Sequence, residues 1–411
     1  MFFRLFPVAL LLVLTQTAGL NMKKLLCLSL VASVLSPIRS WAADPLDKVM
    51  PVRGFCIAAP RPRELDRFVT FIDKELAPRG VNTLVLRVDY NYQFQSHPEL
   101  REHGALSREE VKKLVAVCRK DNIHLIPHIN LLGHQSGGTY LEPLLAKYPE
   151  FDETPWIKMP KDYPEWPNAD RFYCKSYCPL HPKVHEVVFA VMDELCDVFE
   201  TDAFHAGMDE VMYIGESKCP RCGGKDPAEL FAGEVAAIHD HLKSKGRHMW
   251  MWSDRLLDAK STGLGEWESS TNGTSRAIDL IPKDITLCDW HYEQAVPTAP
   301  YLAAKGFHVV SCPWNVSSVA VRQARDMAHW RRSSPPELKN RLDGVLQTVW
   351  SPAGGFLNRE YRNHRRMTPQ ADIHGAQLLN RNFKSHRRPD NSWNCFTAMF
   401  DEIKKLRRET K

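Results

Sequence analysis

Residues 183–210 read KVHEVVFAVMDELCDVFETDAFHAGMDE, and residues 228–253 repeat the same order of patterns as AELFAGEVAAIHDHLKSKGRHMWMWS. In the first stretch, apolar residues recur at helical spacing over Lys183–Phe199, and a short β-rich run follows at Ala203–Gly207. The second stretch has the same helix-then-strand order. Strands that are separated by a helix pair in parallel, so these stretches predict repeated β/α units.

Strand-like runs occur eight times along the chain. They are expected at Arg53–Ala59, Thr83–Asp89, His124–Asn130, Ala203–Gly207, His248–Ser253, Ile285–Trp290, His308–Pro313 and Val345–Trp350. Helical patterns lie between them at Glu64–Leu76, Ser107–Lys120, Lys183–Phe199, Ala228–Lys245, Ala299–Lys305 and Ser317–Arg332. Eight such units predict an α/β fold of the closed (β/α)8, or TIM, barrel type. A doubly wound open sheet is the structural alternative, but it does not need eight units.

The connection after the third strand is unusually long. It runs over Leu131–Pro182 and carries several Trp and Tyr residues, which is typical of loops that shape a binding cleft. Beyond the eighth strand a last helix is expected near Gln370–Leu379. We expect one catalytic domain over residues 50–385 and a helical appendage over residues 386–411.

The composition is that of an ordinary globular chain. Of 411 residues, 44% are hydrophobic and 25% are charged, which excludes collagen-like, low-complexity and mostly disordered proteins. The net charge of +5 comes largely from the amino terminus: four of the 54 basic residues and no acidic residue lie in residues 1–43, leaving 50 basic against 49 acidic residues. A nucleic-acid partner is therefore not expected, because such a domain keeps a strong positive field.

The amino terminus has the pattern of an export signal. The apolar runs Phe6–Leu14 and Leu25–Leu35 each follow basic residues, and neither has the roughly 20 residues of a spanning helix. Residues 1–42 are expected to be a signal peptide cleaved after Ala42, with Met22 as the true start. A long signal or a signal anchor is the alternative. Export predicts a secreted or periplasmic protein with no membrane contact after cleavage.

Cys219-Pro-Arg-Cys222 stands out among the ten cysteines beyond Ala42. A CxxC pair beside two glycines can close a local disulfide, which export permits, or supply half of a structural zinc site. Cys174 and Cys178 are the candidate partners. Buried free thiols are expected in three strand-like runs, at Cys56, Cys288 and Cys312. The sequence predicts no cofactor and indicates no oligomeric state.

Polar and aromatic residues gather where the predicted strands end, which is where TIM barrels place their active sites. These are Asp89, Asn130 with His134, Asp209 with Glu210, Trp252 with Asp254, Trp290 with Tyr292, Trp314 with Asn315, and Trp350. Aromatic faces stack on sugar rings, and carboxylates and amides bind hydroxyl groups. One such Trp can simply fill the barrel mouth, but four together favour a sugar site.

The run Phe204–Glu210, FHAGMDE, resembles the His-x-Gly-x-Asp-Glu motif that ends strand four in glycoside hydrolase family 20, the β-N-acetylhexosaminidases. Arg53, followed by Gly, resembles the family's sugar-binding Arg, and His134, preceded by Gly, resembles its Pro-Gly-His. The likeness covers about residues 50–352. It implies an amino-sugar glycan as substrate and the binding residues Arg53, Asp89, His134, His205, Trp252, Asp254, Trp290, Tyr292, Trp314 and Trp350.

The resemblance also implies a mechanism in which the substrate's own 2-acetamido oxygen attacks the anomeric carbon. Glu210 is then the general acid, and burial beside an ionised neighbour would raise its pKa as that role requires. Asp209 stays charged and orients the acetamido group. Adjacent residues on a strand point in opposite directions, so the chain must bend after the strand for both carboxylates to share one site.

Three positions depart from the family pattern. Met208 stands where a second Gly is common. Trp314-Asn315 stands where the family's Tyr is expected, so Tyr292 is the candidate substitute for that Tyr. Pro352 replaces the acid of the usual Trp-x-Glu. These departures predict a divergent branch of the family.

Three other functions are weighed against the substrate-assisted enzyme. A conventional glycosidase would use Glu210 with Asp254 or Asp289, and a catalytically silent sugar-binding protein would keep only the pocket. A metal-dependent hydrolase is the least favoured, because no tight two-His motif is present. Its candidate ligands are His128, His134, His205 and Asp209.

Overall fold

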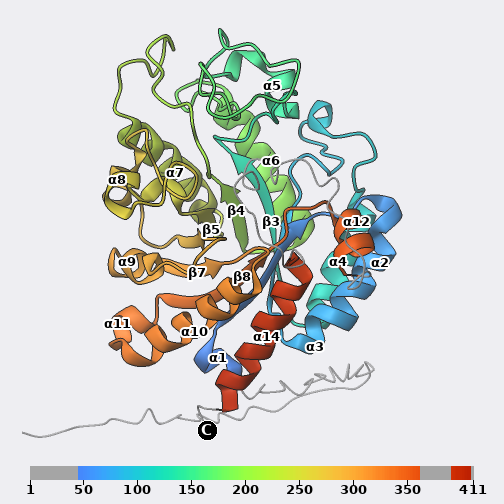
Figure 1. Cartoon of the computed structure of the whole chain (residues 1–411). Helices are drawn as coiled ribbons and strands as arrows, with labels where there is room; N and C mark the ends of the chain where they lie inside the picture. The colour runs from blue at the N-terminus through green and yellow to red at the C-terminus, as the bar shows by residue number, and fades with distance from the viewer. Residues whose placement is uncertain (1–44, 362–389, 409–411) are drawn as a thin grey trace, which may run out of the picture. The chain divides into compact units, whose positions relative to one another are not determined.

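The computed structural model describes residues 45–361 and 390–408, and its centre is a closed barrel of eight parallel strands (Figure 1). The strands are β1 Val52–Ala58, β2 Thr83–Arg87, β3 His124–Leu131, β4 Ala203–Gly207, β5 His248–Trp252, β6 Thr286–Trp290, β7 His308–Cys312 and β8 Leu342–Thr348. Each strand pairs with the next, and β8 pairs with β1 to close the barrel. The expected (β/α)8 fold and its eight strands are confirmed, although β8 begins three residues earlier than predicted.

Helices surround this barrel (Figure 1). The longer ones are α2 Leu65–Phe71, α4 Arg108–Lys120, α6 Val184–Phe199, α7 Pro227–Ser244, α9 Thr298–Ala304, α10 Ser317–Ser333 and α14 Ser392–Arg408. Shorter ones are α1 Pro45–Val49, α3 Ala77–Arg79, α5 Pro143–Lys147, α8 Ala259–Thr262, α11 Pro336–Lys339 and α12 Ala353–Gly355. Helix α4 begins at a capping box: Ser107 Oγ accepts from the Glu110 amide at 3.3 Å, and Glu110 Oε2 accepts from the Ser107 amide at 2.8 Å.

The connection from β5 to β6 has no long helix. It consists of α8 and the 3-10 turns Asp254–Leu256 and Thr274–Asp279. The fully buried Arg255 holds it in place, because its Nη2 donates to the carbonyls of Trp267 at 2.9 Å and Ser269 at 2.7 Å. This connection therefore reaches over the barrel mouth in a defined shape.

Helix α14 is part of the barrel rather than the appendage that the sequence analysis expected. It lies against α10, α1 and β8, and its Phe396 ring meets Phe55 of β1 with centroids 5.1 Å apart. The apolar face of α14 thus covers the seam between β8 and β1. The helix expected at Gln370–Leu379 and the expected signal peptide, residues 1–42, lie outside the described residues.

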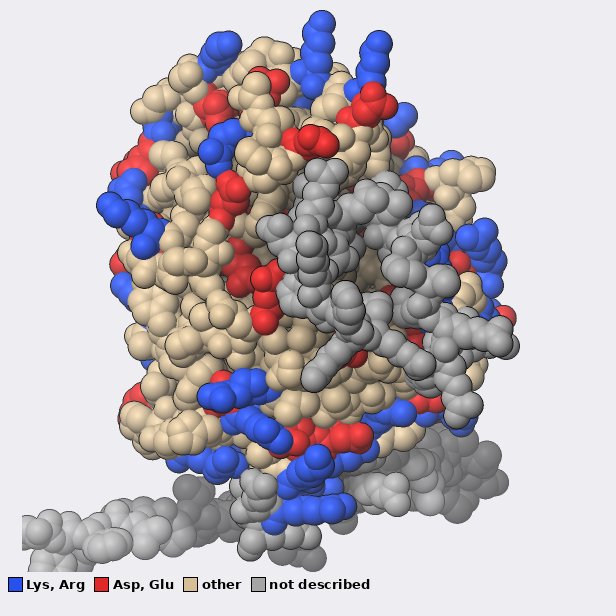
Figure 2. Space-filling view, in the orientation of Figure 1, with Lys and Arg blue, Asp and Glu red and all other residues tan. Residues whose placement is uncertain are grey.

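Apolar side chains form most of the barrel interior, together with the buried imidazoles of His128 and His205. Cys56, Cys288 and Cys312 lie there as buried free thiols, as predicted, and burial raises the pKa of Cys56 to about 12. Among residues 45–361 and 390–408, no helix is both long and apolar enough to cross a membrane. Figure 2 shows acidic and basic side chains interspersed over the described part of one face.

Candidate active site

The backbone bends sharply at the end of β4. Gly207, Met208 and Glu210 all have positive φ, at 68°, 73° and 47°. Side chains rarely tolerate such angles, and a Cβ on Gly207 would lie only 2.2 Å from Asn130 Oδ1, so glycine is required there. The bend brings Asp209 and Glu210 to one side of the chain, as the shared site demands.

His134 joins the two carboxylates. Its Nε2 lies 3.0 Å from Glu210 Oε2 and 3.4 Å from Asp209 Oδ2. Burial lowers the pKa of His134, but the acidic groups of Cys174, Asp209 and Glu210 outweigh it and raise the pKa well above the usual value. A protonated imidazole therefore bridges the pair and compensates its negative charge.

Asp209 is held in its charged form. Only 5% of the residue is exposed, and burial alone would raise its pKa. The positive charge and the hydrogen bond of His134 oppose this effect. The side-chain amide of Asn130 also donates to Asp209 Oδ1 at 2.8 Å, and together these contacts outweigh burial and lower the Asp209 pKa to about 2. A fixed negative charge at this position can stabilise positive charge that develops on a bound substrate.

Asp254 fixes the backbone of Glu210. Its Oδ2 accepts from the Glu210 amide at 2.9 Å and from Arg255 Nε at 2.7 Å, and Oδ1 accepts from Trp290 Nε1 at 3.3 Å. Burial raises the pKa of Asp254 to about 6, although Arg255 opposes the shift. With both oxygens engaged inside the protein, this carboxylate positions the pair and does not face outward.

Aromatic rings from the ends of β6, β7 and β8 form one wall of the site, and Trp252 from the end of β5 packs behind it. Tyr292 stacks on Trp290 at 4.9 Å between centroids and meets Trp314 edge-on at 5.4 Å. Trp350 Nε1 donates to the Tyr292 hydroxyl at 2.9 Å. Trp252 is fully buried and contacts Trp350 at 5.7 Å. The structure thus gathers the aromatic residues that the sequence placed separately at strand ends.

The catalytic domain model described as "Glycosyl hydrolase family 20, catalytic domain" matches residues 85–351, which include this bend, the carboxylate pair and the wall. The chain belongs to glycosyl hydrolase family 20. The run Phe204–Glu210 and His134, which carry most of the predicted resemblance, lie inside the matched region, whereas Arg53 lies before it.

Curated relatives of family 20 are similar over much of this chain. A lacto-N-biosidase of Bifidobacterium bifidum is 24% identical over 82% of this chain and 28% of its own length. A β-hexosaminidase of Akkermansia muciniphila is 32% identical over 64% of this chain and 56% of its own length. The chain thus spans about a quarter to just over half of the length of these relatives.

Solved structures show the same fold. A crystal structure of a β-N-acetylhexosaminidase matches with a TM-score of 0.58 and 18% identity, covering 88% of this chain and 76% of the other. A chitobiase of Flavobacterium johnsoniae matches with a TM-score of 0.53 and 18% identity, covering 86% and 52%.

Arg53 does not reach the family 20 site, so its expected sugar contact is wrong. It is the second residue of β1, at the amino end of the barrel, and it is 4% exposed. Its Nε donates to Gly80 O at 2.7 Å, and Nη1 pairs with Asp47 at 2.8 Å. Arg61 follows the carboxyl end of β1 instead, where its Nη1 donates to Asn91 Oδ1 at 3.0 Å. The place of each arginine along β1 distinguishes them: Arg53 lies at the start of the strand and Arg61 lies after its end, where the active site of such a barrel lies.

His205 lies inside the barrel. It is fully buried between His128 and Trp252, with ring centroids 4.8 and 4.6 Å away, and its Nδ1 accepts from the Gly207 amide at 3.1 Å. Burial, reinforced by His128, lowers its pKa well below the usual value. His205 is therefore neutral, and its hydrogen bond with the Gly207 amide stabilises the bend from inside the barrel.

An acidic group lies on the opposite side of the mouth. The Asp89 carboxylate accepts a hydrogen bond from the backbone amide of Asn130 at 3.2 Å. Glu142, which the sequence analysis missed, has a pKa raised to about 7 by burial and by the charges of Asp89 and Glu102. Arg61 forms an ion pair with Glu102. These hydrogen-bonding groups lie at the carboxyl ends of β1 to β3.

The long β3–α6 connection also reaches the site. Tyr173 meets the His134 ring at 5.7 Å and stacks edge-on against Trp267 at 4.8 Å, and Trp166 contacts Trp267 at 5.1 Å. Trp267 was not predicted, since it lies in the irregular β5–β6 connection. We call Trp166, Tyr173 and Trp267 the aromatic platform.

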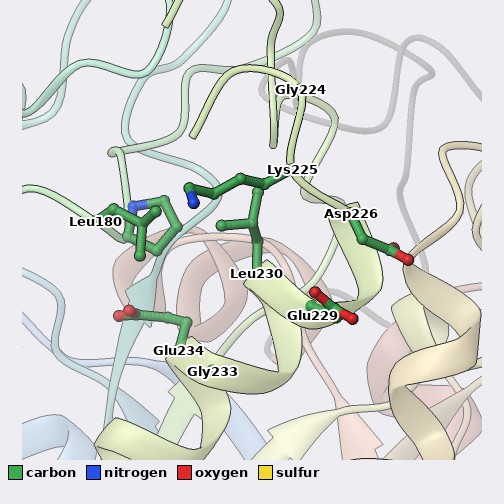
Figure 3. A pocket seen from close by; sticks show the side chains of 9 residues that line it. Leu180, Gly224, Lys225, Asp226, Glu229, Leu230, Gly233 and Glu234 are labelled. Carbon is green, nitrogen blue, oxygen red and sulfur yellow. The ribbon is translucent and has the colours of Figure 1, made fainter. Parts of the chain in front are cut away.

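A separate cavity of about 430 Å³ lies away from this chemistry (Figure 3). It is lined by residues just before α6, by the turn before α7 and by the first turns of α7: Pro179, Leu180, Gly224, Lys225, Asp226, Glu229, Leu230, Gly233 and Glu234. None of the catalytic candidates lines it, so the geometry of the carboxylates, and not this cavity, defines the active site.

Proposed function

We propose that this protein is a glycoside hydrolase that removes β-linked N-acetylhexosamine residues by a substrate-assisted, retaining mechanism. The observation that carries the proposal is the bend after β4, which brings the carboxylates of Asp209 and Glu210 into contact with the same nitrogen of His134. Family membership and the β-hexosaminidase relatives support the same activity.

In the first step the 2-acetamido oxygen of the sugar attacks its anomeric carbon. The bond from this carbon to the leaving oxygen breaks, its electron pair goes to that oxygen, and Glu210 supplies the proton. A cyclic oxazolinium forms, whose positive charge Asp209 stabilises because its pKa of about 2 keeps it ionised.

In the second step water attacks the anomeric carbon from the side that the leaving group vacated. Glu210, now a carboxylate, takes a proton from this water, and the bond to the acetamido oxygen breaks. Two inversions restore the β configuration. Asp254 holds the Glu210 amide throughout, so the acid and the base remain at one position.

Tyr292 takes the place of the missing family tyrosine. Its hydroxyl accepts from Trp350 Nε1, which leaves its own proton available for the acetamido oxygen. Burial raises the pKa of Tyr292 well above its usual value, so the hydroxyl keeps that proton.

The conventional two-carboxylate mechanism is less compatible with this site. Asp254 is engaged by Glu210, Arg255 and Trp290. Asp289 is 1% exposed, accepts from Ser253 Oγ at 3.0 Å, and accepts from Thr298 Oγ1 at 2.7 Å. Neither carboxylate is free to attack a sugar.

Hydrolysis of matched aryl substrates tests the proposal. The protein should cleave aryl β-N-acetylglucosaminide or β-N-acetylgalactosaminide but not aryl β-glucoside, and a thiazoline that mimics the oxazoline should inhibit it. Equal turnover of the glucoside would favour the two-carboxylate alternative. Sugar binding without any turnover would identify the silent sugar-binding protein.

We also propose that the substrate is an extended or substituted glycan. Pro352 cannot accept hydrogen bonds through its side chain, so the outer hydroxyls of a terminal sugar lack the usual family acid. Asp89 and Glu142 offer oxygens on the opposite side of the mouth. The aromatic platform lies beside His134 and Glu210, and because the acid must touch the leaving oxygen, this platform faces the leaving-group side. Its rings would stack on further sugars.

Export is a separate proposal that rests on the amino-terminal pattern alone. A secreted or periplasmic location suits an enzyme acting on glycans outside the cytoplasm. Amino-terminal sequencing of the native protein tests it: a start at Ala43 is expected, and an intact Met1 or Met22 would contradict it.

A further inference from the structure

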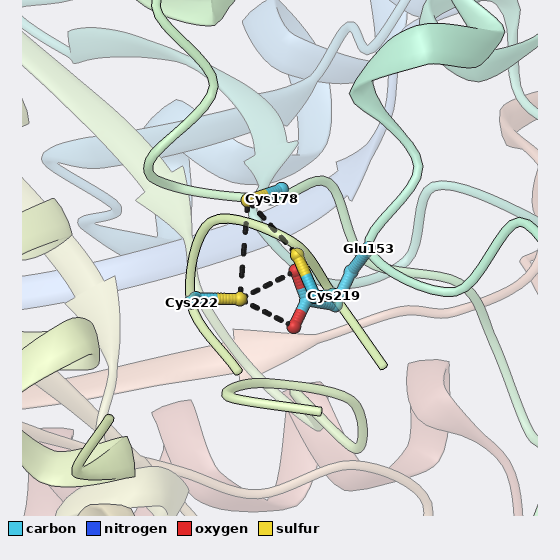
Figure 4. Close-up of side chains that lie close together, drawn as sticks. All are labelled: Glu153, Cys178, Cys219 and Cys222. Atoms are coloured by element: carbon cyan, nitrogen blue, oxygen red, sulfur yellow. Dashed lines mark hydrogen bonds between the residues drawn. The ribbon is translucent and has the colours of Figure 1, made fainter. Parts of the chain in front are cut away.

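Three cysteines and one glutamate converge beneath the loops next to the active site (Figure 4). Glu153, Cys178, Cys219 and Cys222 are each at most 4% exposed, and one ligand atom from each lies within 4.8 Å of all the others. Cys178 is one of the two partners expected for the CxxC pair. Cys174, the other, lies outside the cluster, with its Sγ 3.8 Å from Glu210 O.

Local backbone structure builds each half of the cluster. The Glu153 amide donates to Ser176 O at 3.0 Å and the Cys178 amide to Phe151 O at 2.7 Å, which pairs the middle of the β3–α6 connection with its carboxyl-terminal part. On the other side, the Gly223 amide donates to Cys219 O at 3.0 Å and closes the CxxC turn. A Cβ at Gly223 would lie 2.6 Å from Cys219 O, so the turn requires glycine.

The sulfur separations have the size that a tetrahedral zinc ion imposes. With Zn–S bonds of about 2.3 Å, tetrahedral geometry places two sulfurs about 3.8 Å apart. Cys178 Sγ lies 3.6 Å from Cys219 Sγ and 3.9 Å from Cys222 Sγ. A disulfide would use two of the three sulfurs and leave the third and the carboxylate unused.

The buried carboxylate of Glu153 is a second indication that a cation binds in this cluster. Glu153 is fully buried, and its carboxylate contacts the Cys222 thiol, at 2.7 and 2.9 Å, and the Glu216 amide, at 3.0 Å. In the described part of the chain, no ion pair contains Glu153. A buried carboxylate is stable when a metal or another cation compensates it.

We propose that Glu153, Cys178, Cys219 and Cys222 bind one structural Zn²⁺ ion. Four protein ligands complete a tetrahedral shell, so the ion has no open position for substrate or water and does not take part in catalysis. It fastens the β3–α6 connection, which carries Tyr173, to the β4–α7 connection, which carries Glu210. The zinc centre thus stabilises the two loops that frame the leaving-group side.

Metal analysis of the purified full chain tests this proposal. Wild-type protein, dialysed against metal-free buffer, should retain about one zinc per chain. Cys222→Ser should lose at least about tenfold in zinc content, and Glu153→Gln should release zinc to a chelator about 10 to 100 times faster. Cys196→Ser, which removes a buried thiol of α6 outside the cluster, should keep wild-type zinc.

If the variants fail to fold, two measurements on the wild-type protein test the proposal by themselves. After exchange with Co²⁺, the protein should show thiolate-to-metal charge-transfer absorption, and the chelator should make three further thiols available to alkylation. Substoichiometric zinc that dialysis removes would overturn the proposal. A disulfide among the three cysteines, seen as a mass lower than that of the reduced chain by two hydrogen atoms, would also overturn it.

Discussion

Asp209→Asn is the substitution that most directly separates the roles of the two carboxylates. The variant keeps the size of the side chain and its contact with the Asn130 amide, but it removes the charge opposite His134. The shift of the Asp209 pKa from 3.8 to about 2 corresponds to roughly 2 kcal/mol in favour of the ionised form. Since the folded pKa is depressed, this stabilisation is present above about pH 4 and is lost as the pH falls through about 2.

At pH 7 we therefore expect Asp209→Asn to lose up to roughly 2 kcal/mol of unfolding free energy, measured by urea denaturation. We expect kcat to fall about 100- to 1000-fold, because the charge that stabilises the oxazolinium is gone. The loss should be similar for aryl N-acetylhexosaminides with good and poor leaving groups, since Asp209 does not protonate the leaving oxygen.

Asp343→Asn is the matched control. Asp343 lies near the amino end of β8 and pairs with His308 Nδ1 at 2.9 Å, so the control also breaks a carboxylate–histidine contact but at the opposite end of the barrel. It should keep wild-type kcat. A folded Asp209→Asn variant whose kcat falls less than tenfold, or whose loss follows leaving-group pKa, would refute the assigned role.

Four further outcomes are expected. Glu210→Gln should lose about 100- to 10,000-fold in kcat on substrates with poor leaving groups and far less on activated ones, and a uniform loss would place the acid elsewhere. Tyr292→Phe should lower kcat about tenfold or more with little change in unfolding m-value, and unchanged kcat would show that another group contacts the acetamido oxygen. The pKa of Asp254 is raised to about 6, so ionisation of this carboxyl destabilises the folded wild type as the pH rises from 4 to 7. Asp254→Asn lacks this ionisation, so its unfolding free energy should rise by about 3 kcal/mol relative to that of the wild type over the same range. Parallel pH profiles of the two proteins would contradict this. Extended amino-sugar glycans should exceed small aryl N-acetylglucosaminides in kcat/KM by about tenfold or more, with Trp267→Ala removing the gain, whereas equal values would show that Pro352 is compensated.

The barrel follows from the amino-acid sequence alone, and the resemblance to the family 20 motif singles out the end of its fourth strand. Alternation of helical and β-rich patterns is a local property that each segment carries, so these patterns suffice to locate all eight strands. The position of Asp209-Glu210 at the end of β4 then predicted the site and the need for a backbone bend. Three positive φ angles, at Gly207, Met208 and Glu210, supply that bend.

Which distant residues complete each cluster depends on the tertiary structure. The folded chain places Arg53 at the amino end of the barrel and Arg61 at the carboxyl end, and it pairs Cys178 rather than Cys174 with the CxxC turn. Glu153 and Trp267 lie in irregular connections, where no periodicity marks the direction of a side chain. Such contacts depend on how loops from different strands fold over the same barrel mouth, and no local pattern in either loop encodes that packing.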